Sequence, residues 1–457
     1  MRAWVALLGL AGLCACMGPR AAIPPEAAVA PPVTWRDPVP GAAAPVAADW
    51  WNGFGDPVLA HLVEQALAHN DDIAQAAARV SAARAQLRLA HGNQGPEVDV
   101  TGIGGYTRQL EVTGPLTTWG AEVGGTIAYD FDLFGRLRSA SKAARAQLLA
   151  TQAARDAMRL AVASTVAHGY IMLLAQDRQL AIARETLAAR AASLKLQQRL
   201  SASGYAAQLD LHQAEAEYQA TAQLVPQVAL AVTQSENALS VLIGVAPGAI
   251  PRGQGGLEGL AAPAVAPALP AALLRRRPDI AAAEDNMVAA DHTLDAARAA
   301  MMPNLALTGN AQRIFAEVLP TPESAFLIGG SVLAPIFDSG RRRAAADAAS
   351  ARRDEAAFAY RAATLEAFKE VENAIAALQR SAQQRRALEG QVRAEQASLR
   401  IATQRYRAGY ASYLNQIDAQ RALLSAQLSL TQVDAAWLAA HVEMIRALGG
   451  GWSAPGS

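Results

Sequence analysis

The chain has 457 residues, with 40 basic and 40 acidic side chains, a formal charge of zero and only 5% aromatic residues. This neutral balance argues against a nucleic-acid-binding protein, which needs an excess or a stripe of basic residues. Both cysteines lie within the first sixteen residues, and the seven histidines are scattered without ligand spacing. The sequence therefore predicts no disulfide framework, no metal site and no cofactor.

The N-terminus has the features of an export signal. After a short positive start, residues 4–13 form an apolar run that is too short to span a bilayer as a mature helix. The segment that ends at Cys16 resembles the bacterial lipobox, so residues 1–15 are interpreted as a lipoprotein signal peptide and Cys16 as the lipidated N-terminus. The Pro- and Ala-rich residues 16–48 then form the lipid anchor and an extended tether. A plain signal peptide with incidental cysteines is the alternative.

The second half of the chain repeats the first. A ladder of apolar residues with seven-residue spacing recurs 205 residues later with one polar substitution, and the Gly-Tyr-Ala triplets at 204 and 409 share that offset. Upstream the offset is 207, which takes Pro96 to Pro303. Such self-similarity indicates an internal duplication. We expect a first repeat over 49–243, a linker over 244–270, a second repeat over 271–447 and a C-terminal tail over 448–457.

Each repeat is predicted to contain a helix, two strands, a long helix and a shorter helix. The seven-residue spacing is typical of left-handed coiled-coil packing. The long helix exceeds the shorter helix by about the length of the helix that precedes the strands. That first helix can therefore stack end-on against the shorter helix. The predicted helices of the first repeat are 71–89, 138–201 and 206–243. The predicted strands are 97–102 and 118–131 in the first repeat, and 305–309 and 326–336 in the second.

The strands alternate between apolar and polar residues. In 118–131 one face is apolar and the other carries Glu122 and Thr126. No segment after the signal is judged long and apolar enough for a membrane-spanning helix, residues 160–175 being the best candidate, so a membrane would be crossed by strands. Four strands do not close a barrel, and open edges do not face lipid, so two or three chains must pool their strands. The alternative is an amphipathic hairpin packed on a soluble core.

Five motifs carry a resemblance to a known family. They are WWNGFGDPVL (50–59), DLFGR (132–136), RRPDI (276–280), PIFDSGR (335–341) and RYRAGY (405–410). With them the chain resembles the TolC-like outer-membrane efflux proteins, in particular their OprM/NodT-type lipoprotein branch. The resemblance implies a mainly α-helical homotrimer, with a twelve-stranded outer-membrane barrel above a periplasmic tunnel of long helical hairpins. The implied partners are outer-membrane lipid, a periplasmic membrane-fusion adaptor and an inner-membrane transporter of the RND type.

Candidate functional residues lie near the two helix-turn-helix tips. Gly204 and Gly409 provide the positive φ that a sharp reversal needs, which alone explains them, and the resemblance implies that these tips also dock the adaptor. The resemblance further implies that Tyr406 helps to hold the periplasmic gate shut, that Leu414 forms an apolar ring and that Asp418 forms an acidic ring around the axis. A solvated helix aspartate is the alternative for Asp418.

These features predict a non-enzymatic, lipid-anchored outer-membrane exit duct that passively conducts drugs or other small amphiphilic compounds and confers antibiotic resistance. The alternatives are a duct for type I protein secretion or metal export, or a periplasmic coiled-coil scaffold. The Arg341–Arg343 run is interpreted as a solvated face where barrel meets tunnel, with a lipid-headgroup or nucleic-acid patch as the alternative. No nucleophile–base pair, paired acid site or phosphate loop is recognisable.

Overall fold

The structure is a computed structural model that describes residues 20, 22–37, 46–111, 114–265, 267, 269–317 and 319–453. Cys16 and the predicted signal peptide lie outside these residues. The chain forms two compact units. The first unit consists of residues 1–29, 78–153 and 280–363, and the second consists of residues 30–77, 154–279 and 364–457. Each unit therefore combines segments from both halves of the sequence, and each is described by itself.

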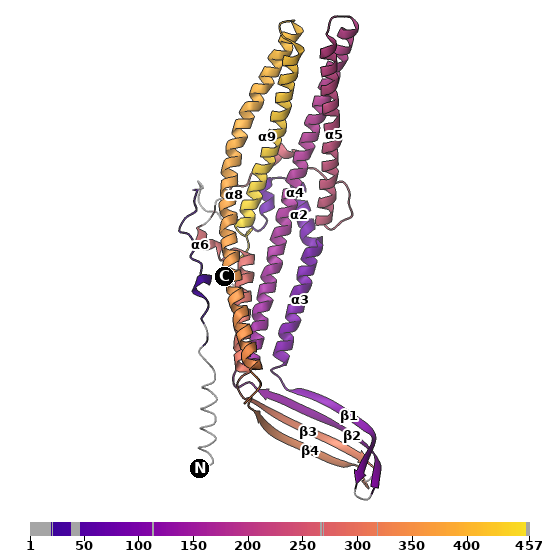
Figure 1. The fold of residues 1–457 in the computed structure, drawn as a ribbon, viewed down its shortest axis with the longest axis vertical. Helices are drawn as coiled ribbons and strands as arrows, with labels where there is room; N and C mark the ends of the chain where they lie inside the picture. Colours follow the sequence, from indigo (N-terminus) through magenta and orange to yellow (C-terminus); the bar gives the residue numbers. More distant parts are fainter. Residues whose placement is uncertain are drawn as a thin grey trace. The chain divides into compact units, whose positions relative to one another are not determined.

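The first unit contains one antiparallel sheet with the strand order β1-β2-β3-β4 (Figure 1). Its strands are β1 Glu97–Glu111, β2 Gly114–Phe131, β3 Asn304–Ala316 and β4 Glu323–Leu333. Glu97 faces Ala128 in the first hairpin and Asn304 faces Leu333 in the second, which is the same register once the two offsets are applied. The strands are longer than predicted at the hairpin ends.

At the end of the last strand the prediction is wrong in the opposite direction, because the strand is shorter than expected. The strand pattern was expected to continue to Ile336, whereas β4 ends at Leu333. The corresponding last residues of β2 pair with β3, but no described residue of the chain pairs with the outer side of β4. The end of β4 therefore lacks the ladder hydrogen bonds that extend β2.

The two faces of the sheet differ in polarity, as the alternation predicts. Val100, Tyr106 and Trp119 share one face, where Tyr106 lies directly opposite Trp119. Glu122 and Thr126 lie on the other face. Successive side chains of a strand point to opposite faces, so the pairing keeps the alternation of the four strands in line. The face of Val100 is mainly apolar, with Arg108 and Arg313 as its charged residues.

The helices of the two halves have matching bounds. α3 (Asp71–Gly92) corresponds to α7 (Pro278–Ala299), α4 (Arg136–Ala202) to α8 (Arg341–Arg407) and α5 (Gln208–Leu242) to α9 (Tyr413–Ala447). α4 and α8 each contain 67 residues and are therefore about 100 Å long. The shorter elements are η1 Pro25–Ala27, η2 Trp50–Phe54, α2 Pro57–His69, η3 Leu257–Gly259 and α6 Pro270–Leu273.

The end of α5 meets the start of α3, as end-on stacking predicts. Asn70 caps α3 because its Oδ1 accepts from the N–H groups of Asp72 and Ile73 at 3.0 and 3.2 Å. Its Nδ2 donates to the carbonyl oxygen of Leu242, at the end of α5, at 2.9 Å. One side chain thus satisfies unpaired backbone groups of two helix ends.

The second repeat joins its helices at the equivalent place with a charged residue. Arg277 occupies the position of Asn70, and its Nη1 donates to the carbonyl oxygen of Ala447, at the end of α9, at 3.1 Å. The same buried guanidinium binds Asp279 in the first turn of α7 and Glu370 on α8, each at 2.6 Å. A buried cation is stable only with such partners.

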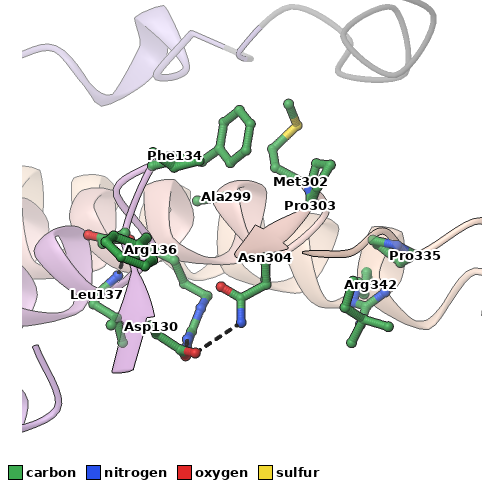
Figure 2. A pocket seen from close by; sticks show the side chains of 15 residues that line it. Asp130, Phe134, Arg136, Leu137, Ala299, Met302, Pro303, Asn304, Pro335 and Arg342 are labelled. Carbon is green, nitrogen blue, oxygen red and sulfur yellow. Dashed lines mark hydrogen bonds and ion pairs between the residues drawn. The ribbon is translucent and has the colours of Figure 1, made fainter. Parts of the chain in front are cut away.

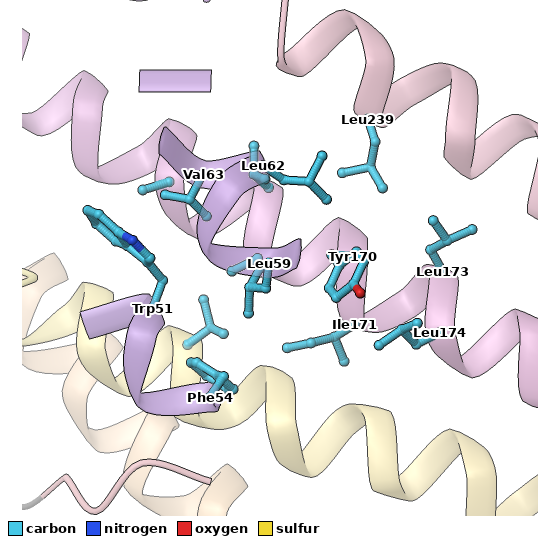
Figure 3. Packing of buried hydrophobic residues seen from close by; sticks show 14 of the residues in the cluster. Trp51, Phe54, Leu59, Leu62, Val63, Tyr170, Ile171, Leu173, Leu174 and Leu239 are labelled. Atoms are coloured by element: carbon cyan, nitrogen blue, oxygen red, sulfur yellow. The ribbon is translucent and has the colours of Figure 1, made fainter. Parts of the chain in front are cut away.

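A large apolar cluster lies in the second unit, where α2 packs on α4 (Figure 3). Leu59, Leu62 and Tyr170 are among its fully buried side chains. One window of α4 is, contrary to our prediction, long and apolar enough to cross a membrane, and half of that window is buried inside the chain. Residues 162–175 of α4 supply much of this cluster, which accounts for their hydrophobicity without a membrane.

Candidate functional site

The two hairpin tips reverse with the same backbone geometry. Gly204 and Gly409 have φ values of 73° and 78°, in the left-handed region that glycine adopts without strain. The N–H of Tyr205 donates to the Leu200 carbonyl at 2.8 Å, and the N–H of Tyr410 donates to the Arg405 carbonyl at 2.8 Å. Both tips are therefore Schellman-type helix ends. The two tyrosine side chains are exposed at the turns.

Of the three predicted gate residues, Tyr406 lies in the seam between the α4–α5 and α8–α9 hairpins. Its hydroxyl accepts a hydrogen bond from Nε2 of the fully buried Gln197, on α4, at 2.6 Å. Its ring lies 5.4 Å, centroid to centroid, from that of Tyr413. Leu414 and Asp418 are instead exposed in the single chain. Leu414 is 45% accessible to solvent, and the side chain of Asp418 is 61% accessible. The structure does not bring these two into the seam.

A chain of charges that the sequence analysis missed crosses the same seam. Glu217 on α5 is buried between two arginines: Oε2 lies 2.7 Å from Nη1 of Arg190 on α4, and Oε1 accepts from Nε of Arg421 on α9 at 2.7 Å. Arg421 also reaches Asp418, with Nη1 3.6 Å from Oδ1. Glu217 therefore connects one hairpin to the other, and Asp418 is the exposed end of this chain of charges.

The environment of these arginines differs. Burial lowers the pKa of Arg190, with the carboxylate of Glu217 acting in the opposite direction. The hydrogen bond to Glu217 raises the pKa of Arg421, which lies nearer solvent. Burial also raises the pKa of the neighbouring Tyr413 hydroxyl. Both guanidinium groups stay charged at any physiological pH, because arginine titrates far above it.

A signal for this cluster was present in the heptad pattern. Ala183, Arg190 and Gln197 follow one another at seven-residue spacing, and all three are buried. They occupy the second core position of each heptad, where an apolar residue is expected. Polar residues at such a position indicate a polar layer between helices, whereas the predicted ladder followed only the other, mostly apolar core position.

The seam is incompletely hydrogen bonded. Within the part of the chain that the structure describes, Nε of Arg190 and Oε1 of Gln197 are buried without a hydrogen-bond partner. Buried polar atoms without partners weaken an interface, because separation would let water satisfy them. The arrangement is suited to two hairpins that are held together by specific bonds and can separate. Across the same described ranges, no group of three His, Cys, Asp or Glu side chains is placed to hold a metal ion.

Among the described residues, the chain combines a four-stranded amphipathic sheet with two unpaired edges and two long helical hairpins, a combination typical of a subunit of a membrane channel. A family model described as "Outer membrane efflux protein" matches residues 62–245 and 269–450. The chain belongs to the outer membrane efflux protein family. It is a channel protein of the outer membrane, and the assignment that the motifs suggested is confirmed.

Known proteins resemble the chain over most of its length. It is 33% identical over 455 residues to the pyoverdine export outer membrane protein OpmQ of Pseudomonas putida, covering 97% of this chain and 96% of the relative. It is 33% identical over 411 residues to the antibiotic efflux pump outer membrane protein ArpC of Pseudomonas putida, covering 88% and 85%. The crystal structure of a membrane protein from Pseudomonas aeruginosa superposes with a TM-score of 0.82 at 31% identity, covering 92% of this chain and 100% of that one.

Proposed function

We propose that three copies of this chain form the exit duct of a tripartite efflux system for small amphiphilic organic compounds. The observation that carries the proposal is the four-stranded sheet, which is mainly apolar on one face and more polar on the other, and whose edge strands β1 and β4 have no further strand beside them among the described residues. Single-chain outer-membrane barrels begin at about eight strands, so chains must pool their strands. Three copies give the twelve-stranded barrel that the family resemblance implies. A periplasmic adaptor and an inner-membrane transporter of the RND type complete the system.

The proposed cargo is supported by the relatives, of which one is named for pyoverdine export and another for antibiotic efflux. The test is the susceptibility of a deletion strain to amphiphilic antibiotics, dyes, detergents and metal salts, with and without the wild-type gene. We expect sensitivity to organic compounds that the wild-type gene reverses. Sensitivity to metal salts alone would favour metal export, and an unchanged panel with a depleted secreted proteome would favour type I secretion.

We propose that the helical tips form a closed periplasmic gate in which Tyr406, Leu414 and Asp418 take part. Three copies of Asp418 around one axis would form an acidic ring, and three copies of Leu414 an apolar ring. The bond between Gln197 and Tyr406 and that between Glu217 and Arg421 support this proposal, because both join the two hairpins of a chain. Opening then requires these bonds to break while the hairpins separate.

Single-channel conductance in planar bilayers tests the gate. Arg421→Ala removes the exposed arm of the Glu217 cluster while Arg190 still neutralises the buried carboxylate, so we expect a larger open fraction than in the wild type. Arg400→Ala, which removes an exposed arginine from α8, is the matched control. Equal open fractions for the wild type and Arg421→Ala would contradict the proposed role of the seam.

We propose that the tips around Gly204 and Gly409 dock the adaptor. The exposed Tyr205 and Tyr410 next to these glycines offer two equivalent contact points per chain. A photo-crosslinking residue placed at Tyr205 or Tyr410 should capture the adaptor in cells. The same residue at Tyr360, on the tunnel helix α8, should not. Equal capture from all three positions would argue against docking at the tips.

We propose that Cys16 carries the lipid anchor. Arg20 binds Asp291 and lies 3.4 Å from Asp295, both on α7, which ends at Ala299 just before β3. Asp291 lies about 12 Å from the end of α7, and the four residues from Cys16 to Arg20 span up to about 14 Å when extended. Acyl chains on Cys16 are thus within reach of the membrane. Mass spectrometry of the mature N-terminus tests this, with Cys16→Ser expected to lose the added mass.

A further inference from the structure

The boundary between strands and helices contains a junction between the two repeats. A cavity of about 220 Å³ lies there, between the turn that leads from β2 into α4 and the segment that leads from α7 into β3 (Figure 2). Phe134 comes from the first of these segments, and Met302 and Pro303 from the second. This cavity therefore marks the contact between the first and second repeats within one chain.

Three polar side chains bridge this junction. Asp130, at the end of β2, binds Nη2 of Arg136 in the first turn of α4, at 3.2 Å. Its other carboxylate oxygen accepts from Nδ2 of Asn304, the first residue of β3, at 3.2 Å (Figure 2). The carboxylate thus comes from the first repeat and is shared by residues of both repeats.

A second cavity, of about 580 Å³, has the equivalent position at the outer edge of the sheet. Residues of its lining correspond, at the offset of 207, to lining residues of the first cavity. These pairs are Gly92 with Ala299, Gly95 with Met302, Pro96 with Pro303 and Glu97 with Asn304. This cavity lies at the β1 edge of the sheet, whereas the turn that follows β4 lies at the opposite edge. Only a second copy of the chain can therefore place its post-β4 turn against this cavity.

The duplication also predicts how two copies pair. The offset of 207 takes β1 to β3, and the offset of 205 takes β2 to β4. Together they convert the register of the first hairpin into that of the second, so they are valid for these strands. Applied to the β2–β3 register, in which Thr126 faces Asn310, they place Ser331 of β4 opposite Ile103 of the neighbouring β1. The same register sets the apolar Ile328 opposite Tyr106, so the apolar face continues across the boundary between copies.

The charges at the second junction are complementary between copies. Arg341 corresponds to Arg136, but Pro335 replaces Asp130 and removes the carboxylate from that side. Glu97, the counterpart of Asn304, supplies a carboxylate from the other side. Glu97 is exposed and makes no ion pair within the described residues, and Arg341 is exposed with its Nε on the Asp338 carbonyl at 3.2 Å.

We propose, on the basis of the trimer proposed above, that β4 of each protomer pairs with β1 of the next in this register and that Arg341 forms an ion pair with Glu97 of that neighbouring protomer. Three such pairs form a ring where the strands meet the helices. The contact also covers apolar side chains that a single chain leaves free beside β4, since Ile336 and Phe337 are 93% and 88% exposed. The arginine run therefore begins with an intersubunit residue.

Disulfide crosslinking of the full-length protein in outer membranes tests the register. Cα atoms of directly opposed residues are about 4.5–5.5 Å apart, within disulfide range. We expect the double variant Ser331→Cys/Ile103→Cys to give covalent dimers and trimers under oxidation. Ser331→Cys/Thr101→Cys places the second cysteine two residues away on the same face and should not crosslink. The single variants Ser331→Cys and Ile103→Cys measure the background crosslinking of each position alone. Crosslinking through Thr101 instead of Ile103 would overturn the register.

Charge exchange tests the ion pair. Arg341→Glu and Glu97→Arg should each lower the temperature at which purified trimers dissociate, and the double variant should restore it. Arg343→Glu, an exposed reversal in the same helical turn, should leave it unchanged. If the double variant is no better than the worse single variant while the wild type is trimeric, the ion pair is wrong but the trimer stands. If the wild type forms no trimer, the proposed assembly itself fails.

Discussion

The hydroxyl of Tyr170 connects three segments of the second unit. It donates to Oδ2 of Asp56, the N-cap of α2, at 2.9 Å and accepts from the N–H of Gly253 in the linker at 2.9 Å. Burial and the nearby Asp56 carboxylate raise the pKa of this hydroxyl, so it remains protonated and able to donate. A fully buried ring thus carries one polar atom with two partners.

Tyr170→Phe should reduce the free energy of unfolding by about 1–3 kcal/mol, because it leaves a carboxylate oxygen and an N–H without their partner. Chemical denaturation in detergent measures the loss. Tyr218→Phe on α5 is the control, since no hydrogen bond of its hydroxyl is found among the described residues. Equal stability of the two variants would show that water replaces the lost contacts.

His441 should make the stability of the chain depend on pH. Burial lowers its pKa below the ordinary value of 6.5, although Nδ1 donates to the Trp437 carbonyl at 2.8 Å. The unfolded chain then binds a proton before the folded chain does as the pH falls. Stability should therefore decrease as the pH falls below about 6.5 and level off below the folded-state pKa.

Thermal unfolding of the wild type and of His441→Gln at pH 7.5 and pH 5.5 tests this expectation, with a smaller loss on acidification for the variant. His212→Gln, on the exposed face of α5, should retain the wild-type dependence. If His441→Gln loses as much stability as the wild type on acidification, another group is responsible for the effect.

At the scale of elements, the two end-on helix junctions use different chemistry at equivalent positions. Asn70→Ala removes a helix cap and should cost about 1 kcal/mol. Arg277→Ala removes a buried cation from Asp279 and from the half-buried Glu370, and leaves the Ala447 carbonyl without its donor, so it should cost about 3 kcal/mol. Arg446, which binds Glu370 at 2.9 Å, limits the second loss.

Chemical denaturation measures the free energy of unfolding of Asn70→Ala and Arg277→Ala. The variant Asn70→Asp, which retains a capping side chain, is measured beside them. Asn70→Asp keeps the acceptor for the N–H groups of α3 but no longer donates to the Leu242 carbonyl, so it should fall between wild type and Asn70→Ala. A larger effect for Asn70→Ala than for Arg277→Ala would contradict the assigned roles.

At the scale of the whole molecule, membrane insertion should distinguish the two sheet faces. Val123 and Glu122 are neighbours on β2 whose side chains lie on opposite faces. A charge on the lipid-facing side of a barrel costs about 2–4 kcal/mol at the midplane, whereas the lumen tolerates it. Val123→Lys should therefore reduce the amount of folded protein in outer membranes, and Glu122→Lys should not. Heat-modifiable mobility in gels measures the folded fraction.

Much of the architecture follows from local sequence patterns. The period-two alternation predicts the two faces of the sheet, and the repeat offsets anticipate the matching bounds of α4 and α8 to the residue. Glycine at 204 and 409 predicts the tips, because a single φ value is a local property. The alternation of a strand, the length of a helix and the conformation of a turn depend mainly on residues that are close together in the chain, so they can be predicted from the sequence.

The charged seam and the end of β4 were decided by tertiary structure. Arg190 and Glu217 are 27 residues apart, and Arg421 belongs to the other repeat, so only packing brings them together. Leu160 to Ala175 reads by composition as a membrane candidate, yet packing against α2 places much of that stretch in a core. Local patterns are sufficient to identify the strands, the main helices and the duplication, but not the full length of each strand. Packing alone determined which buried charges meet, because their energies depend on partners that are distant in the chain.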